Sequence, residues 1–487
     1  MLFNSIQFAL FLPVVFFLYW FVVNRNLKLQ NVLLLVSSYF FYACWDYRFL
    51  FLLIFSTLLD YFTGLKMSDA PNETRKKFWF WLSIIINLGF LGVFKYFNFF
   101  AESFAQATES LGWHVDPWTI SVILPVGISF YTFHGLSYVI DIYKNRIQPE
   151  RNFVVYSVFV SFFPLLVAGP IERATHLLPQ IQKVRHFDYI RAVDGLRQIL
   201  WGLFKKVVIA DGCAEFANTI FNHSDQYSGW TLVLGALFFT FQIYCDFSGY
   251  SDIALGTARL FGMELLRNFA FPYFSRDIAE FWRRWHISLS SWFRDYLYVP
   301  LGGSKGGTWM KVRNTFIIFL VSGFWHGANW TFIAWGALNA IYFLPLLLLN
   351  KNRSNLEIVA QGKMLPTLRE SMQMLITFGL TVLAWIFFRA ESISHALDYI
   401  HDLFVGLVQK SSIIEAVNFV LMRTGFVLPA FVFVFLMMEW IGRERQYALS
   451  HIGWTWPRPV RWMLYLAIGF AVLLFAGKEQ QFIYFQF

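Results

Sequence analysis

The sequence predicts an all-α protein that crosses a membrane many times. Hydrophobic residues make up 57% of its 487 residues and charged residues only 14%, which is too little charge to cover a soluble protein of this size. Apolar segments recur along the whole chain, and most approach the roughly 20 residues of helix that span about 30 Å of hydrocarbon. We therefore expect one polytopic domain over residues 1–487, with roughly a dozen transmembrane or half-spanning helices.

Short polar connections separate the apolar segments. The first segment, residues 2–23, has no basic residue before it and no cleavage site after it, so we expect a retained span rather than a removed signal peptide. Residues 315–349 are long enough for a helical hairpin. The other expected helices cover residues 29–44, 49–65, 78–100, 118–143, 153–171, 230–247, 371–388, 425–440 and 462–476. The motifs described below lie in a core of residues 120–350, and C-terminal helices follow within residues 371–487.

Basic residues indicate how the chain is oriented. They cluster in alternate connections, near residues 25–28, 66–77 and 144–151, whereas residues 101–117 contain none. Because positively charged loops stay in the cytoplasm, the N-terminus is predicted outside and the basic stretch 259–313 cytoplasmic. The chain has no Lys or Arg between Lys206 and Arg259, which predicts an outside loop at residues 211–229. The net charge of +9 thus fits an anionic leaflet, and we expect no nucleic-acid partner.

Two sets of potential ligands have simpler structural explanations. The three cysteines, Cys44, Cys213 and Cys245, lack the spacing of a disulfide framework or a zinc site. Another set has helical spacing that suits a metal, but a solvated helix face explains it better: His395, Asp398, His401 and Asp402. We expect neither a metal nor another bound cofactor.

Polar residues follow the 230–247 segment directly, in the sequence DFSGYSDIALG from Asp246 to Gly256. Polar groups at membrane depth must pair within the protein or face water, so this stretch indicates either a substrate path or a hydrogen-bond network at a helix end. The pattern leaves both explanations open. Asp246, Ser248 and Asp252 are the candidate residues.

A basic, aromatic stretch, EFWRRWHISLSSWFRDYLYVPLGGSKGG, runs from Glu280 to Gly307. Read as one helix, its large apolar residues recur every three or four positions and form a stripe: Trp282, Trp285, Leu289, Trp292 and Tyr296. Arg283, Arg284 and Arg294 add positive charge. The pattern predicts a helix at the cytoplasmic interface that anchors the chain or binds an anionic ligand, and by itself it favours the anchor. The glycine-rich loop at residues 301–307 lacks the ending of a phosphate-binding P-loop.

His326 lies in GFWHGANW, Gly323 to Trp330, within an apolar run that has no other acidic or basic side chain. Such a residue at membrane depth indicates a function, although a hydrogen bond to a neighbouring helix is the other explanation. A neutral imidazole can accept the proton of a hydroxyl that attacks an ester or thioester. Gly323 and Gly327 permit close helix packing or passage of a ligand, and we expect mainly clearance for a ligand.

Several of these motifs together resemble a known family. FWRRWHISLSSWFRDYLYVPLGG and the later SGFWHGANW resemble the two signature regions of the membrane-bound O-acyltransferases, or MBOAT family. LPVGISFYTF, FFPLLVAGPIER and DFSGYSDIALG are similar to its bacterial branch, which contains the alginate O-acetyltransferase membrane subunit and the teichoic-acid D-alanyl transfer protein. The resemblance implies a ring of helices around a thin core with a central tunnel.

The resemblance also implies roles for single residues. His326, in the W-H-G motif, would be the catalytic base, and His286 the second signature histidine, which polarises a carbonyl or lines the tunnel. The expected donor- or substrate-binding residues are Arg283, Arg284, Trp285, Arg294, Asp246, Ser248, Asp252 and Asn329.

The activity implied is that of an O-acyltransferase, and most simply an O-acetyltransferase, in the cytoplasmic (inner) membrane of a bacterium. The donor would be acetyl-CoA or an acyl-phosphopantetheine carrier protein, and the acceptor an extracytoplasmic polysaccharide such as alginate, or a cell-wall polymer. Because the chain has no Ser-His-Asp domain, we expect a separate exported or periplasmic acetyltransferase as partner. Two alternatives stay open: a transporter or polymer-export channel with His326 as proton-relay or gating residue, and an acyltransferase for lipid or protein.

Overall fold

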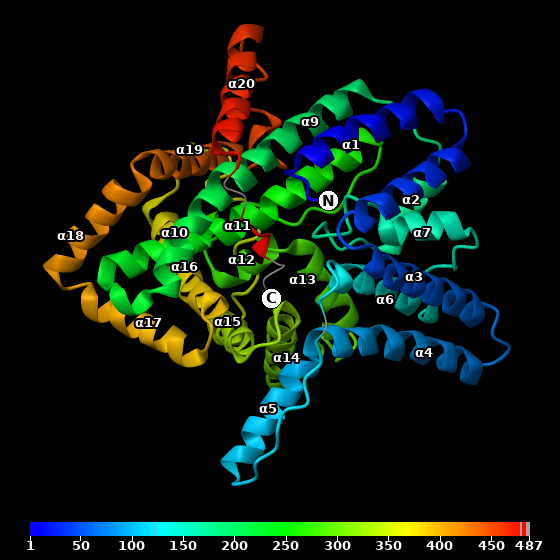
Figure 1. Ribbon diagram of the computed structural model, residues 1–487, viewed down its shortest axis with the longest axis horizontal. Helices are drawn as coiled ribbons and strands as arrows, with labels where there is room; N and C mark the ends of the chain where they lie inside the picture. The colour runs from blue at the N-terminus through cyan, green and yellow to red at the C-terminus, as the bar shows by residue number, and fades with distance from the viewer. Residues whose placement is uncertain (122, 478–479, 484–487) are drawn as a thin grey trace. The chain divides into compact units, whose positions relative to one another are not determined.

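The computed structural model describes residues 1–121, 123–477 and 480–483. These residues form α-, π- and 3-10 helices and no β-strand, so the predicted all-α class is confirmed. Val122, within the expected helix 118–143, and part of the expected C-terminal region 371–487 lie outside the described residues. Figure 1 shows the helices of the chain with their labels. The backbone divides into two compact units, which are described separately. The single domain stays a prediction.

Unit 1 comprises Met1–Gly195 and Ala254–Leu266. Its helices are α1 (Ile6–Phe17), continued by η1 (Leu18–Val22), α2 (Leu27–Ala43), α3 (Tyr47–Ser68), α4 (Glu73–Leu91), η2 (Gly92–Tyr96), α5 (Phe97–Ser110), α6 (Ile128–Tyr143), α7 (Phe153–Ser161), α8 (Ala174–Gln182), and the start of α9 (Tyr189–Leu203). Helix α3 packs against α4 and α6. Its buried Asp60 accepts hydrogen bonds from Ser83 Oγ at 2.6 Å and Asn87 Nδ2 at 2.8 Å, which satisfies a carboxyl that would otherwise be costly to bury.

Two expected helices of unit 1 are shorter than predicted. Residues 113–121 and 123–127 are not helical, and α6 begins after Gly127, whose φ of +74° lies in the left-handed region that favours glycine. Helix α7 ends at Ser161 because Pro164 and Pro170 follow, and residues 162–170 form turns buried in the protein. Irregular backbone is tolerated at this depth only where protein covers it, so an apolar run overstates the length of such helices.

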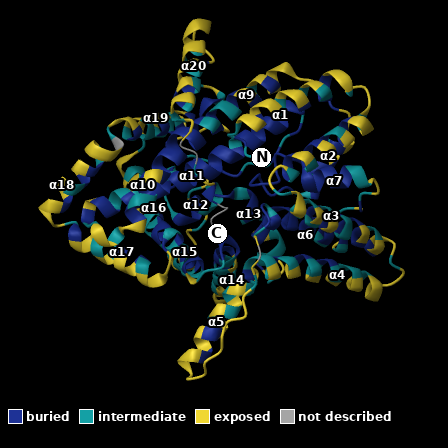
Figure 2. Ribbon diagram, in the orientation of Figure 1, coloured by how far each residue is buried: buried dark blue, intermediate teal, exposed yellow. Residues whose placement is uncertain are grey.

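Unit 2 comprises Leu196–Ile253 and Arg267–Phe487. It contains the rest of α9, then η3 (Phe204–Ala210), α10 (Asp211–Asn222), η4 (Ser224–Gln226), α11 (Gly229–Leu260, whose end belongs to unit 1), η5 (Pro272–Phe274), α12 (Ile278–Arg284), α13 (Ile287–Phe293), η6 (Arg294–Tyr298), α14 (Thr308–His326), α15 (Trp330–Leu348), α16 (Leu368–Arg389), α17 (Ile393–Gly406), α18 (Lys410–Phe419), η7 (Val420–Thr424), α19 (Val427–Gly442), η8 (Ala448–Ser450) and α20 (Arg458–Phe475). Figure 2 shows α11 buried along most of its length, whereas α20 exposes much of its surface.

The stretch 211–229, expected to be an outside loop, is mostly helical. Helix α10 occupies Asp211–Asn222, and its side chains at Cys213, Ala217 and Ile220 are buried. Their spacing of three and four residues is that of an apolar helix face. The loop was expected from the absence of Lys and Arg, which says nothing about helical spacing. The expected loop is therefore wrong, and which side of the membrane this helix faces stays a prediction.

Six helices among the described residues are long and apolar enough to cross a membrane, and one bent pair, α17 with residues 410–423, makes a possible seventh. The six are Tyr47–Ser68, Glu73–Ser110, Gly229–Leu260, Trp330–Leu348, Leu368–Arg389 and Arg458–Phe475. Shorter apolar helices, Ile6–Val22 and Val427–Gly442, accompany them. The chain is thus a multi-pass membrane protein, in which full-length spans are fewer than its apolar segments.

The predicted hairpin at residues 315–349 is confirmed as α14 and α15, which pack closely along their length. A Cβ added at Gly323 would collide with the backbone carbonyl of Phe332, and one at Gly336 with that of Phe319. Small residues that let two helix backbones meet are a common device in membranes. The glycines therefore fix how the two helices approach each other, and with them the position of His326.

Substituting Gly323 tests this packing. We expect Gly323→Ala to destabilise the protein by about 1–3 kcal/mol, because the methyl group has no space beside Phe332. Gly379→Ala in α16 is the matched control, since nothing lies within 4 Å of its new Cβ. The apparent Tm in detergent is the measurement, and equal Tm values for the two variants would contradict close packing at Gly323.

Candidate functional site

His326 is the last residue of α14 and is 4% exposed. Among the described residues its ring lies against those of Trp325, Trp335 and Phe388, with centroid distances of 4.8, 5.2 and 5.2 Å. The rings come from α14, α15 and α16, so the hairpin and the following helix together enclose the imidazole.

His286 lies at a break between α12 and α13. Its φ of +43° is left-handed, and the flanking backbone pairs with another segment: Ala270 N–H donates to the Arg284 carbonyl at 3.0 Å and Ile287 N–H to the Asn268 carbonyl at 2.8 Å. These bonds replace the helical ones and turn the ring inward, where it is 1% exposed. The single helix expected to carry the stripe from Trp282 to Tyr296 is therefore wrong, because tertiary pairing overrides the helical pattern.

The imidazole of His286 is buried among aromatic rings. Its centroid is 4.7 Å from that of Phe247 and 6.0 Å from that of Trp325. Burial lowers the pKa of His286 to about 3, so the ring is neutral near pH 7. Neither ring nitrogen has a hydrogen-bond partner among the described residues. Since buried polar atoms are nearly always paired, these two nitrogens are available to bind a polar group of a substrate.

One aromatic cluster joins the two histidines. Trp325 lies between the two histidines. Its ring centroid is 4.8 Å from that of His326, the next residue in the chain, and 6.0 Å from that of His286. Trp285, next to His286, packs against Trp385 at 5.0 Å, and Trp385 stacks on Trp335 at 5.6 Å. Trp285, predicted to bind the donor, is 1% exposed and belongs to the core of this cluster. The structure thus brings the two predicted catalytic residues into one desolvated environment.

Gly327 and Asn329 have structural roles beside His326. A Cβ at Gly327 would collide with the Phe332 ring, so both glycines of the motif face packed protein, and the expected clearance for a ligand is wrong. Asn329 caps α15, since its Oδ1 accepts the Thr331 N–H at 2.9 Å, and its Nδ2 donates to the Glu391 carbonyl at 3.0 Å. The Asn329 amide is thus occupied within the protein rather than free to hold a donor.

The polar residues after the 230–247 segment form a buried ion-pair network. Lys206 Nζ lies 2.8 Å from Asp246 and 2.7 Å from Asp211, and Lys205 Nζ lies 2.5 Å from Asp252 and 3.0 Å from Ser248 Oγ. A Cβ at Gly249 would lie 2.8 Å from the Gly202 carbonyl oxygen, so α9 and α11 meet closely here. Of the two explanations left open, the structure supports the hydrogen-bond network.

Three members of this region were not predicted from the sequence. Lys205 and Lys206 stand between apolar residues in LFKKVV, and charged side chains in such surroundings generally require partners. Glu439, in the expected helix 425–440, is buried and accepts hydrogen bonds from Tyr244 Oη at 2.6 Å and Trp201 Nε1 at 3.2 Å. An isolated acid within an apolar run was the available signal for Glu439.

The predicted arginines divide into two groups. Arg283 donates to the carbonyls of Asn352 and Asn355 at 2.7 and 2.8 Å, and Arg284 pairs with Glu280 at 2.8 Å. The bonds of Arg283 hold α12 to the α15–α16 connection, so this stretch is not the free amphipathic anchor that the pattern favours. Arg294 is exposed and pairs with Asp295 at 2.8 Å.

Helix α12 also borders an open pocket of about 600 Å³ within unit 2. Its charged lining consists of five arginines and two glutamates: Arg267, Arg283, Arg284, Arg443, Arg445, Glu280 and Glu444. Helix α12 thus presents arginines to the pocket, while its Phe281 and the adjoining Trp285 enter the aromatic cluster, where their rings stack at 5.5 Å. An excess of positive charge in a pocket of this size suits an anionic ligand.

The remaining candidates lie on α17. Asp398 and His401 are exposed and His395 is half-buried, where its ring meets Ser224 Oγ at 3.1 Å. Over the described ranges, no group of three or more His, Cys, Asp or Glu residues is arranged to hold a metal ion.

Comparison with known proteins gives a consistent result. The model of the "MBOAT, membrane-bound O-acyltransferase family" matches residues 147–363, which include both histidines. A Pseudomonas aeruginosa protein named "Probable alginate O-acetylase AlgI" is 37% identical over 92% of this chain and 82% of its own length. A protein of the same name from Pseudomonas putida is 36% identical over 100% of both chains. The "Peptidoglycan O-acetyltransferase" of Helicobacter pylori is 34% identical over 100% of this chain and 98% of its own length.

Proposed function

Because this chain belongs to the membrane-bound O-acyltransferase family, we propose that it passes an acetyl group from a cytoplasmic thioester to an extracytoplasmic polysaccharide or cell-wall polymer. That the chain is an acyltransferase follows from the family and its relatives. The donor, the acceptor, the bacterial inner membrane and the residue roles are the proposed parts. The observation that supports the roles best is the pair of buried histidines on one aromatic cluster, with both nitrogens of His286 unpaired among the described residues.

The proposed step is direct transfer with His326 as general base. His326 takes the proton of the acceptor hydroxyl as the oxygen attacks the thioester carbonyl carbon. The carbon–sulfur bond then breaks, and the leaving thiolate takes the proton from the imidazolium. Neutral His286 donates an N–H hydrogen bond to the carbonyl oxygen as negative charge develops there. The dry aromatic surroundings strengthen both interactions.

The arginine pocket is proposed as the donor's entrance. Acetyl-CoA and phosphopantetheine carry phosphates, and arginines bind phosphate oxygens through charge-assisted hydrogen bonds. The pocket borders α12, and α12 leads directly to His286. Arg283 and Arg284 are therefore proposed to bind the donor as part of the pocket lining. Arg267 and Arg445, which also line the pocket, are proposed to do the same. The basic stretch 259–313 supports a cytoplasmic location of this face by the positive-inside rule, and thioester donors are made in the cytoplasm.

The acceptor is proposed to be a sugar hydroxyl of an exported polymer, reached directly or through a partner. Relatives of this chain are named for alginate and for peptidoglycan. These names support an exported polymer as the acceptor, and they do not select one polymer. A separate exported acetyltransferase would complete the transfer if the first acceptor is a protein serine.

His286 gives the test that separates catalysis from packing. We expect His286→Asn to lower kcat for thioester-dependent transfer about 10- to 100-fold, because a shorter side chain cannot reach the carbonyl oxygen. Asn tolerates a positive φ, so this variant should fold. The assay is transfer of labelled acetyl from acetyl-CoA by the purified protein in detergent.

Two outcomes would contradict the proposal. If His286→Asn kept both the kcat and the apparent Tm of the wild type, His286 would have no role in the reaction. Movement of a substrate through the protein in vesicles without any thioester cleavage would instead favour a transporter.

A further inference from the structure

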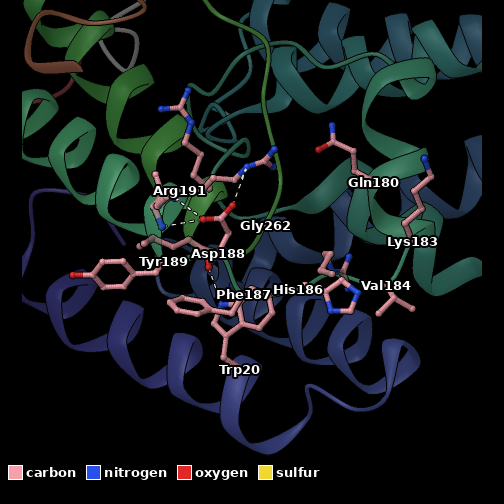
Figure 3. Close-up of a pocket in the computed structure, with 14 residues that line it drawn as sticks. Trp20, Gln180, Lys183, Val184, His186, Phe187, Asp188, Tyr189, Arg191 and Gly262 are labelled. Atoms are coloured by element: carbon pink, nitrogen blue, oxygen red, sulfur yellow. Dashed lines mark hydrogen bonds and ion pairs between the residues drawn. The ribbon is translucent and has the colours of Figure 1, made fainter. Parts of the chain in front are cut away.

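We propose that unit 1 binds the headgroup of an anionic phospholipid in a pocket beside the end of its first apolar helix. The pocket has a volume of about 680 Å³ and is formed by η1, the connection between α8 and α9, and the end of α11 (Figure 3). All three elements belong to unit 1 at this point. The volume is typical of small-molecule sites, which measure about 300–1,000 Å³. This pocket is distinct from the histidines and the arginine pocket, which lie in unit 2.

The pocket lies beside the end of an apolar helix that is shorter than a full membrane span. Trp20 is near the end of the apolar helix Ile6–Val22, and its indole N–H donates to the Leu260 carbonyl at 2.8 Å. Arg25 and Lys28 follow within the next turns. Tryptophan followed by basic residues is typical of the interface where phospholipid phosphates lie, on the cytoplasmic side.

Two cations of the pocket have no acidic partner among the described residues. Arg259 is neutralised by Asp194 at 2.6 Å and Glu264 at 3.2 Å, and Arg191 lies 3.6 Å from Asp188. No described carboxylate lies within 4 Å of the remaining two cations, Lys183 and Arg185. The lining therefore keeps a positive charge that an anion can balance.

Arg185 supplies the most specific observation. It is only 6% exposed, and one guanidinium nitrogen donates to Asn31 Oδ1 at 2.6 Å. Its Nε has no hydrogen-bond partner in the part of the chain that the structure describes. A buried guanidinium N–H without an acceptor is costly, and a phosphate oxygen is a strong acceptor for it.

The rim of the pocket indicates that the anion carries an apolar part. Val184, Phe187, Tyr189 and Ile190 line it and are all exposed. In Figure 3 the rings of Trp20 and Phe187 lie together at one edge, with Asp188 just above them and Lys183 farther away at the right. Exposed apolar side chains around unpaired cations match a phospholipid, whose phosphate and acyl chains adjoin, better than a soluble anion.

Lipid binding to the full-length protein in detergent tests the proposal. Native mass spectrometry would compare phosphatidylglycerol with phosphatidylcholine. We expect preferential binding of phosphatidylglycerol, and about a five-fold loss of affinity in Lys183→Gln, since one interfacial lysine has roughly that effect. Arg185→Gln should lose more, but exposed Lys183 keeps the test valid if Arg185 is needed for folding. Lys77→Gln, an exposed lysine of α4 outside the pocket, is the matched control and should bind as the wild type does.

Four results would overturn the proposal. Equal binding of the two lipids would show that charge is not recognised. Unchanged phosphatidylglycerol binding in both Lys183→Gln and Arg185→Gln would place the lipid elsewhere. Displacement of the lipid by glycerol phosphate at equal concentration would assign the pocket to a soluble anion, and displacement by an acidic carrier protein would assign it to a protein.

Discussion

His326→Ala is expected to lower thioester-dependent acyl transfer by about 10²- to 10⁴-fold, the range that a general base contributes. Among the described residues, the rings packed against the imidazole belong to Trp325, Trp335 and Phe388, and none of these side chains can act as a base. The loss should fall on kcat more than on KM, since the base acts on the reacting hydroxyl rather than on donor binding. The measurement is release of free thiol from acetyl-CoA together with acetyl transfer.

A second variant separates the base from the aromatic packing. His326→Gln keeps a polar side chain of similar length but cannot act as a base near neutral pH, so its activity should match that of His326→Ala. Trp335→Phe, in the adjoining ring, changes the packing and keeps the base, so its activity should stay within about ten-fold of wild type. Unimpaired transfer by His326→Gln would remove the general-base role.

Lys206→Met is expected to lower the free energy of unfolding by about 3–5 kcal/mol, because it leaves Asp246 and Asp211 buried without their shared cation. The apparent Tm in detergent should fall accordingly. Lys77→Met, at an exposed position, is the control and should leave the Tm unchanged.

The rescue variant makes this prediction specific to charge. Replacing both acids as well, in Lys206→Met/Asp211→Asn/Asp246→Asn, removes the uncompensated charges and should recover much of the lost stability. A triple variant less stable than Lys206→Met would contradict the account. If the triple variant recovered stability but stayed inactive, Asp246 would instead belong to the substrate path.

The sequence predicted elements that depend on local pattern. The helices at residues 29–44, 49–65 and 371–388 are close to α2, α3 and α16, because continuous apolar runs between polar ends form membrane helices. The hairpin around His326 was predictable for the same reason. Two signature histidines, 40 positions apart in the numbering, could be paired only through the family resemblance.

Elements that depend on tertiary contacts were not predictable. The break at His286 follows from bonds to Asn268 and Ala270, which no helical periodicity records. Apolar residues buried by protein look the same in sequence as those facing lipid, so α7 was expected to be twice as long. The acids Asp246 and Asp252 were visible, but their partners Lys205 and Lys206 come from a distant helix.

The central claim is transfer of an acetyl group from a thioester through the site at His326. The most direct measurement uses sealed vesicles containing the purified protein, with acetyl-labelled acetyl-CoA on the side of the arginine pocket and an acceptor polymer or exported acetyltransferase on the other side. The account predicts labelled acceptor on the far side, released CoA thiol on the near side, and neither with His326→Ala. Labelled acceptor formed equally by wild type and His326→Ala, or label that crosses the membrane while still attached to CoA, would contradict it.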